Sequence, residues 1–216
     1  MMTKKFNSRK NFYKIVKTFS DFSFSLIFLT LGFPIFVIIS ILIKFSSRGP
    51  IFFSQERIGK NKKIFKCLKF RTMHPEAKDI LENLLANNKN LRKEFEDTHK
   101  LKNDPRITKI GKFLRKTSLD ELPQFFNVLR MEMSIVGPRP IVRSEIIKYG
   151  GSFSKVVSVR PGITGLWQVS GRNNLSYKRR VFLDSLYINK MNLLMDLRII
   201  TRTIGVIFLP GDRGAY

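Results

Sequence analysis

The longest stretch without a charged residue is the feature that most constrains how this chain can fold. It runs from Phe22 to Ile43, which is 22 residues. A helix needs about 20 apolar residues to cross the hydrocarbon core of a bilayer. No small-residue cleavage site follows the stretch and its far flank is basic, so a secretory signal peptide is not indicated. The sequence therefore predicts a helix inserted in a membrane.

The flanking charges and a central proline predict how this helix meets the membrane. Residues 1–18 carry six Lys or Arg and no acid, and residues 44–71 carry nine with only Glu56 opposing them. Because basic flanks stay on the cytoplasmic side, both ends are expected on that side. Pro34 removes a backbone donor and leaves two arms of about 11 residues, each too short to span a bilayer. These features favour a re-entrant helix, and a kinked helix that spans the bilayer is the alternative.

The composition bounds the number of domains and the kind of partner. The chain has 216 residues, of which 43% are hydrophobic and 26% charged, enough apolar material for a core. We expect a basic flank with the membrane-inserted helix over residues 1–48 and one compact domain over residues 49–216. The formal charge of +24 requires an anionic partner: nucleic acid, the anionic leaflet of a membrane, or a phosphorylated substrate.

Cysteine and histidine are too scarce for several kinds of chemistry. The only cysteine is Cys67 and the only histidines are His74 and His99. An intramolecular disulfide, a cysteine zinc cluster and a serine or cysteine nucleophile paired with histidine are therefore not indicated. Any reaction is expected to use carboxylates, basic groups and a hard cation.

The hydrophobic periodicity predicts a mainly α fold with a small β-hairpin. Residues 51–57 and 64–71 alternate like two strands joined by a turn at Gly59. The final predicted helix, 193–208, has an apolar face that suits a membrane surface, and we expect amphipathic helices to pack there. The expected helices cover residues 75–96, 107–114, 118–130, 141–149, 176–190 and 193–208.

Two adjacent acids stand out in a basic part of the chain. The spacing of Ser118 and Glu121 matches a capping box, in which the acids would only stabilise a helix start. That interpretation does not explain why Asp120 and Glu121 lie among so many cations. A carboxylate held among cations at a helix N-terminus stays ionised, attracts phosphates, and can attack phosphorus or hold Mg²⁺.

Several sequence blocks, in order from about residue 20 to the C-terminus, are together similar to those of one family. The chain resembles the bacterial sugar transferase family, the monotopic phosphoglycosyl transferases, in their small form. The blocks are Ile51-Phe-Phe-Ser-Gln-Glu-Arg-Ile-Gly59, Lys69-Phe-Arg-Thr-Met73, Asp104-Pro-Arg-Ile-Thr108, Leu114-Arg115, Ser118-Leu-Asp-Glu-Leu-Pro-Gln124, Asn127-Val-Leu129, Met133-Ser-Ile-Val-Gly-Pro-Arg-Pro140 and Arg160-Pro-Gly-Ile-Thr-Gly-Leu-Trp-Gln-Val-Ser-Gly-Arg172.

The resemblance implies a membrane enzyme that starts surface glycan assembly. Members move a sugar 1-phosphate from a nucleotide diphosphate sugar, here expected to be a UDP-sugar, to a polyprenyl phosphate. Residues 49–216 would be the catalytic domain, on the cytoplasmic face of the bacterial inner membrane. Anionic lipids are expected partners, nucleic acid is not, and the resemblance leaves room for a homo-oligomer.

The same resemblance assigns roles to individual residues. Asp120 would be the nucleophile that takes the phosphosugar, and Glu121 its dyad partner. The family uses Mg²⁺, and Asp120 is the expected protein ligand.

The basic residues of these blocks would bind the substrate phosphates. Arg115 and Arg139 resemble the family's phosphate-contacting arginines, a task that suits the planar guanidinium fork. Lys69 and Arg71 are weaker candidates for the same pocket.

Other positions favour structural roles or stay open. Cys67 is expected to be buried, and Trp167 to pack in the core or a loop rather than contact a nucleotide. Asp184 and Tyr187 match a family pattern whose role the sequence does not reveal. Phe33 precedes Pro34 where relatives often have serine, which weakens the re-entrant prediction.

Two other functions stand beside the enzyme. A related scaffold without catalysis is disfavoured because Asp120 and Glu121 are both present. A membrane-tethered nucleic-acid-binding protein would explain the charge but not the acidic motif, and no helix-turn-helix or zinc-finger spacing appears.

Overall fold

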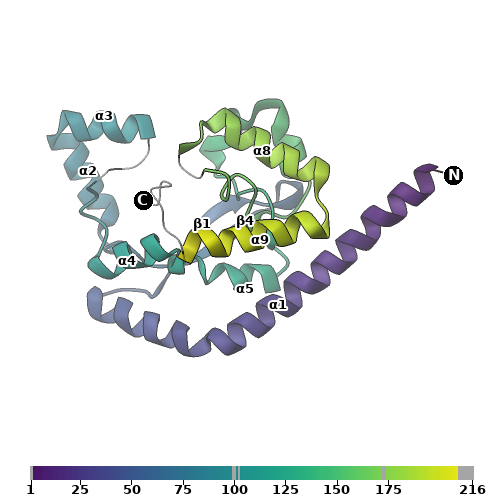
Figure 1. Ribbon diagram of the computed structural model, residues 1–216. Coiled ribbons are helices and arrows are strands. Elements are labelled where there is room, and N and C mark those ends of the chain that lie inside the picture. The colour runs from purple at the N-terminus through teal and green to yellow at the C-terminus, as the bar shows by residue number, and fades with distance from the viewer. Residues whose placement is uncertain (1, 99–100, 102, 172–173, 209–216) are drawn as a thin grey trace. The chain divides into compact units, whose positions relative to one another are not determined.

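The computed structural model describes residues 2–98, 101, 103–171 and 174–208 (Figure 1). The described chain is mainly helical with two small sheets of two strands each, which confirms the predicted mainly α fold, whereas the predicted packing of helices at a membrane face stays a prediction. The main elements are α1 (Met2–Ser46), β1 (Phe52–Ile58), β2 (Ile64–Phe70), α2 (Ala77–Asn87), α3 (Lys89–Thr98), α4 (Lys109–Thr117), α5 (Gln124–Leu129), β3 (Ser134–Val136), α6 (Ile146–Tyr149), α7 (Phe153–Val156), β4 (Gly162–Thr164), α8 (Tyr177–Lys190) and α9 (Leu193–Phe208).

The described residues group into two compact units. The first unit contains the chain up to Phe33, the segment Ser54–Leu68 and the chain from Pro123 onward. The second unit contains Pro34–Phe53 and Lys69–Leu122.

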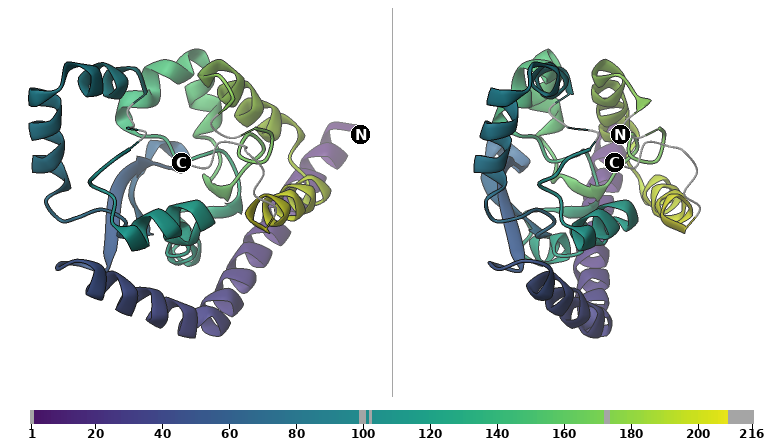
Figure 2. Two further views of the ribbon diagram at one scale, coloured as in Figure 1. Left: turned by 60° about the vertical axis from the view of Figure 1, so that its left-hand side comes forward. Right: turned by 90° about the vertical axis from the view of Figure 1, so that its left-hand side faces the viewer.

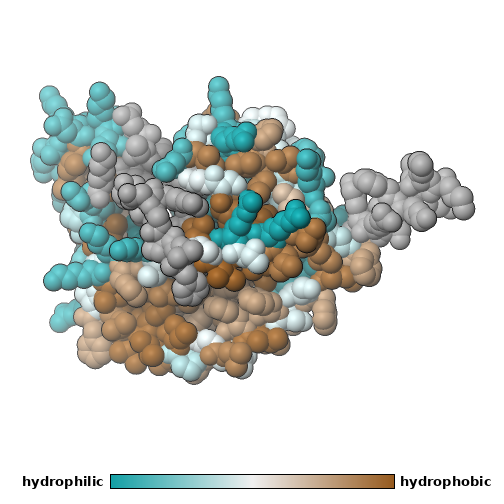
Figure 3. All heavy atoms as spheres, in the orientation of Figure 1, coloured by the Kyte–Doolittle hydropathy of each residue, from teal (hydrophilic) through white to brown (hydrophobic). Residues whose placement is uncertain are grey.

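Helix α1 contains the predicted membrane segment. It is helical on both sides of Pro34, as predicted. Among the described residues it is the one helix long and apolar enough to cross a membrane, over Asn11–Ser46. Large apolar side chains such as Leu31, Phe33 and Phe45 are exposed on it, and Figure 3 shows hydrophobic atoms gathered along this helix. Such exposure favours a lipid environment, whereas re-entry or spanning stays a prediction.

The β-hairpin is confirmed, and a second sheet is new. β1 and β2 pair within one residue of the predicted ends. β3 and β4 form a parallel pair in which Ser134 is opposite Gly162, and both strands lie outside the helices and the hairpin that the periodicity predicted. A Cβ on Gly162 would lie 2.1 Å from the backbone nitrogen of Gly137, so only glycine permits this approach.

Two predicted helices are shorter or broken. The segment 75–96 forms α2 and α3, which meet at a corner at Asn88 (Figure 2). The side-chain oxygen of Asn88 accepts hydrogen bonds from the backbone N–H groups of Asn90 and Leu91, at 3.0 and 3.1 Å, and so begins a new helix. The segment 141–149 is helical only from Arg143, as a 3₁₀ turn followed by the short α6.

Small clusters of buried residues form the core of the first unit. Helix α9 packs on β3 and β4 (Figure 1), with Val136, Tyr187 and Ile199 buried together. Cys67 is buried beside Phe65 on β2, as predicted. Helices α8 and α9 have the predicted bounds within one residue.

Candidate active site

The two acids lie in a 3₁₀ turn, not in the first turn of an α-helix. Ser118 ends α4 in the left-handed conformation, with φ of 58°, and its side chain makes no capping hydrogen bond. The predicted capping box and the predicted start of a helix at residue 118 are therefore wrong. A left-handed residue cannot continue a helix, and Pro123 lacks an N–H donor, so the next helix begins only at Gln124. Asp120 and Glu121 occupy the tight turn between these two breaks, Leu119–Glu121.

Lys69, at the end of β2, connects the two acids. Its Nζ donates to Glu121 Oε1 at 2.6 Å and lies 3.6 Å from Asp120 Oδ2. Asp120 is buried, with 8% of its surface exposed, while Lys69 and Glu121 are partly exposed. Consecutive residues of a tight turn point in different directions, yet one ammonium group spans both carboxylates. The structure thus brings together Lys69, Asp120 and Glu121.

Arg115 reaches the same turn from the last turn of α4. Its Nε donates to Thr72 Oγ1 at 2.9 Å, which fixes the direction of the guanidinium group. Burial lowers the pKa of Arg115, and the negative charge of Asp120 opposes that shift. Arg115 is therefore close enough to Asp120 for the two charges to interact, and phosphate binding by Arg115 stays a prediction.

The pKa of Asp120 is raised above its ordinary value. Burial is the largest cause, the charge of Lys69 opposes it, the charge of Glu121 adds to it, and Arg115 opposes it again. We expected cations and a helix N-terminus to keep this carboxylate ionised. Instead, loss of hydration outweighs the neighbouring cations, so the ionised form of Asp120 is less stable than that of an exposed aspartate.

Arg71 is hydrogen-bonded at the C-terminus of α1. Its Nη2 donates to the backbone oxygen and the Oγ of Ser47, at 2.7 and 2.9 Å, at the C-terminus of α1. Its Nη1 is buried without a hydrogen-bond partner among the described residues. The contacts with Ser47 indicate that Arg71 fixes the end of α1, and a contact with substrate stays a prediction.

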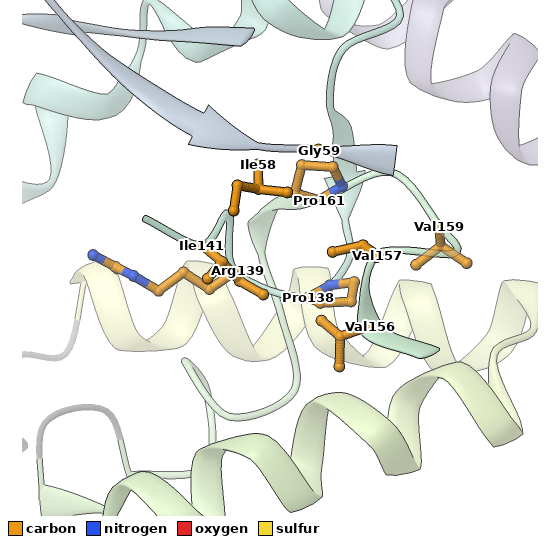
Figure 4. Close-up of a pocket in the computed structure, with 9 residues that line it drawn as sticks. All are labelled: Ile58, Gly59, Pro138, Arg139, Ile141, Val156, Val157, Val159 and Pro161. Atoms are coloured by element: carbon orange, nitrogen blue, oxygen red, sulfur yellow. The ribbon is translucent and has the colours of Figure 1, made fainter. Parts of the chain in front are cut away.

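Arg139 belongs to the first unit and follows β3. It lines a small pocket with apolar side chains, and Figure 4 shows its guanidinium group directed away from them. The cavity volume of this pocket is about 10 Å³, roughly the space that one water molecule needs, so the pocket is too small for a ligand. The guanidinium carbon lies 5.8 Å from the centre of the Trp167 ring. Trp167 itself is buried, as predicted.

Asp184 and Tyr187, whose roles the sequence left open, are buried on α8. Asp184 accepts a hydrogen bond from the Tyr149 hydroxyl at 3.2 Å. Tyr187 donates to Asp196 Oδ1 at 2.7 Å, and its hydroxyl also lies 3.2 Å from the backbone oxygen of Val136. Both residues thus connect elements of the first unit.

The N-terminal part of α1, to which the sequence assigned only a role at the membrane, also contacts other elements of the first unit. Lys17 Nζ lies 2.9 Å from Asp196 Oδ2, and the Tyr13 hydroxyl donates to the same oxygen at 2.8 Å. Asp21 accepts from the Ser134 hydroxyl at 2.6 Å. These contacts fix α1 to α9 and β3. In the sequence, only the two isolated acids, Asp21 and Asp196, beside apolar segments could have indicated them.

The carboxylates of the acidic turn suit one kind of metal ion. Within the described part of the chain, no three His, Cys, Asp or Glu side chains are grouped closely enough to hold a metal by themselves. Mg²⁺ keeps several waters and is commonly bound by one or two carboxylates together with substrate phosphates. Asp120 and Glu121 thus have the ligand chemistry that a magnesium site of this kind needs, and binding of Mg²⁺ stays a prediction.

Comparison with known proteins gives one consistent result. The family model for the bacterial sugar transferase matches residues 12–210. A UDP-galactose-lipid carrier transferase of Erwinia amylovora is 46% identical over 210 residues, covering 97% of this chain and 43% of its own length. The exopolysaccharide production protein ExoY of Rhizobium meliloti is 47% identical over 183 residues, covering 85% of this chain and 80% of its own. An undecaprenyl-phosphate galactose phosphotransferase of Salmonella typhimurium is 49% identical over 168 residues, covering 78% and 35%. The chain thus spans less than half the length of two of these relatives.

Proposed function

The chain belongs to the bacterial sugar transferase family, and we propose that it transfers a sugar 1-phosphate from a UDP-sugar to undecaprenyl phosphate. The observation that carries this proposal is that Asp120 is buried and that the ammonium group of Lys69 forms ion pairs with both Asp120 and Glu121. The names of the Erwinia and Salmonella relatives support the two substrates, and that of the Rhizobium relative supports a part in exopolysaccharide production.

In the first half-reaction, Asp120 acts as the nucleophile. A carboxylate oxygen of Asp120 attacks the phosphorus that bears the sugar, the bond from that phosphorus to the bridging oxygen breaks, and UMP leaves with the electron pair. Arg115 and Lys69 lower the energy of the transition state because their charges face the phosphate oxygens. Burial of Asp120 leaves its ionised form poorly solvated, so it is a better nucleophile than a hydrated carboxylate.

In the second half-reaction, the enzyme returns to its starting state. An oxygen of undecaprenyl phosphate attacks the same phosphorus, and the bond to Asp120 breaks to regenerate the carboxylate. Glu121 is partly exposed and hydrogen-bonded to Lys69, so it can hold a proton from the incoming phosphate. When bound, Mg²⁺ would neutralise charge on the diphosphate, with Asp120 as its protein ligand and Glu121 beside it.

The membrane location is part of the same proposal. An acceptor with a polyprenyl chain is confined to the bilayer, and α1 offers an apolar surface of the right length. The basic flanks of α1 favour a re-entrant helix, with the acidic turn on the cytoplasmic face of the bacterial inner membrane.

The decisive experiment isolates the first half-reaction. Protein purified in detergent is incubated with Mg²⁺ and a panel of UDP-sugars without any acceptor, and its peptides are analysed by mass spectrometry. We expect one sugar-phosphate adduct on the peptide that contains Asp120, and none in Asp120→Asn. In Glu121→Gln the adduct should form while turnover with undecaprenyl phosphate falls by about 100-fold or more. An adduct on another peptide, or turnover by Asp120→Asn, would refute the assignment.

A further inference from the structure

Thr72 contacts both ends of helix α4, and all the residues involved belong to the second unit. The backbone oxygen of Thr72 accepts a hydrogen bond from the N–H of Thr108, the residue before the helix, at 3.1 Å. Its hydroxyl oxygen accepts from Nε of Arg115, in the last turn, at 2.9 Å. Thr108 and Arg115 are seven residues apart, about two turns, so they lie on one face of α4. One residue of a neighbouring segment thus fixes this face at both ends.

The face of α4 between these two contacts lies directly on the backbone of Thr72. A Cβ on Gly111 would overlap the backbone oxygen of Thr72, so only glycine permits the helix to approach this closely. The next residue along adds to the attachment, because Met73 pairs with Ile107 in an antiparallel bridge. Backbone contacts therefore set the position of α4, and the hydroxyl of Thr72 acts on the side chain of Arg115.

The hydrogen bond to Thr72 uses Nε, the guanidinium nitrogen nearest to the main chain of Arg115. A guanidinium group has two edges that can offer two parallel N–H groups to a phosphate, one formed by Nε and Nη2 and one formed by Nη1 and Nη2. Because Nε donates to Thr72, the edge formed by Nη1 and Nη2 is the one that remains for such a contact. Thr72 is buried, with 7% of its surface exposed, so water does not readily take the place of its hydroxyl.

We propose that Thr72 is a positioning residue for the transfer reaction. Its hydroxyl holds Arg115 so that the edge formed by Nη1 and Nη2 binds the oxygens of the phosphate that Asp120 attacks. The charges of Asp120 and Arg115 interact, which is consistent with one phosphate lying against both groups. The inference rests on the proposed function, because it takes Asp120 as the nucleophile. It adds a role for Thr72, to which the family resemblance assigned none.

The rate of adduct formation on Asp120 measures this role. Protein in detergent is mixed with Mg²⁺ and a saturating concentration of the reactive UDP-sugar, without acceptor, and the adduct is followed over time by mass spectrometry. Thr72→Val keeps the shape and removes the hydroxyl, so the rate constant should fall by roughly 10- to 100-fold, the range for a hydrogen bond to a charged group. Thr72→Ser keeps the hydroxyl and should stay within about threefold of the wild type.

A double variant and a matched control separate positioning from stability. Arg115→Ala removes the side chain on which Thr72 acts, so adding Thr72→Val should slow adduct formation by about twofold at most. Thr108→Val is the control, because Thr108 is also 7% exposed and its hydroxyl accepts from the N–H of Gly111 at 2.9 Å. Loss of this N-cap should lower Tm and leave the rate constant within about twofold of the wild type.

A measurement on the wild-type protein tests the contact without relying on catalysis. In protein labelled with ¹⁵N-arginine, the Nε–H signal that disappears in Arg115→Lys belongs to Arg115. Its exchange with solvent should be at least about 10-fold slower than in Thr72→Val, because a hydrogen-bonded N–H exchanges only when the bond opens. An Arg115 Nε–H that exchanges in the wild type as fast as that of an exposed arginine would overturn the inference, even if Thr72→Val does not fold.

The remaining outcomes distinguish this inference from the proposed function. A folded Thr72→Val with the wild-type rate, an equal loss of rate in Thr108→Val, or losses that multiply in the double variant would each overturn the positioning role. If the wild type forms no adduct on Asp120, the proposed function fails, and the exchange of the Nε–H still decides whether Thr72 holds Arg115. Slow adduct formation in Thr72→Val, a normal rate in Thr72→Ser and no further loss in the double variant support the inference.

Discussion

We predict that Asp184 makes the stability of the protein depend on pH, and that the substitution Asp184→Asn removes this dependence. The carboxyl group is fully buried on α8. Burial raises its pKa to about 8, and the hydrogen bond from Tyr149 and the backbone N–H and charge of Arg139 oppose that shift only in part. At neutral pH the folded protein therefore holds Asp184 mainly in its protonated form, while the unfolded chain does not.

The size of the effect follows from proton linkage. Because the folded state binds the proton more tightly, the contribution of Asp184 to stability is complete below the ordinary pKa of 3.8 and is lost as the pH rises towards about 8. The loss amounts to about 1.4 kcal/mol per pH unit at most. For a domain of this size, that corresponds to a fall in Tm of about 3 to 5 °C per pH unit. Above pH 8 the dependence should level off.

The test compares Asp184→Asn with the wild type. Asparagine keeps the shape and can accept the hydrogen bond from Tyr149, but it has no proton to lose. Melting temperatures in detergent, measured by Trp167 fluorescence from pH 5.5 to 8.5, should diverge as the pH rises, with the variant more stable at the alkaline end. Asp79→Asn, an exposed position on α2, is the control and should stay parallel to the wild type. Parallel curves for Asp184→Asn as well would refute the argument that this carboxyl is protonated.

Three further outcomes concern the active turn, the attachment of α1 and its topology. Turnover should fall about tenfold per pH unit below the raised pKa of Asp120, because only the ionised carboxylate attacks phosphorus; a flat pH–rate profile would contradict this role. Asp196→Ala should lower the free energy of unfolding by about 3 to 5 kcal/mol, and Tm by roughly 10 °C, because Lys17, Tyr13 and Tyr187 lose their hydrogen-bond acceptor. A fall in Tm of only about 1 °C would show that these contacts contribute nothing to stability. Tags at the two ends of the chain should both be protected from external reagents in intact cells, and labelling of the N-terminal tag alone would exclude the re-entrant helix.

Local signals in the sequence predicted most of the elements correctly. The periodicity of residues 176–190 and 193–208, and the alternation on both sides of Gly59, are properties of short windows, so α8, α9 and the hairpin were found within one residue. The family blocks likewise indicated Asp120 and Glu121, because a motif is read from adjacent positions. Asn88 is the counterexample: its side chain begins a new helix where the apolar pattern alone continues.

Only the tertiary structure decided which residues far apart in the chain come into contact. The sequence by itself determined a long apolar helix, a basic protein and an acidic motif. It did not determine that Ser118 turns left-handed, that Lys69 lies across both acids 51 and 52 residues away, or that burial raises the pKa of Asp120. Such properties depend on which distant groups exclude water from a site. Hydration and Coulomb energies are set by three-dimensional distance, which no local pattern of residues encodes.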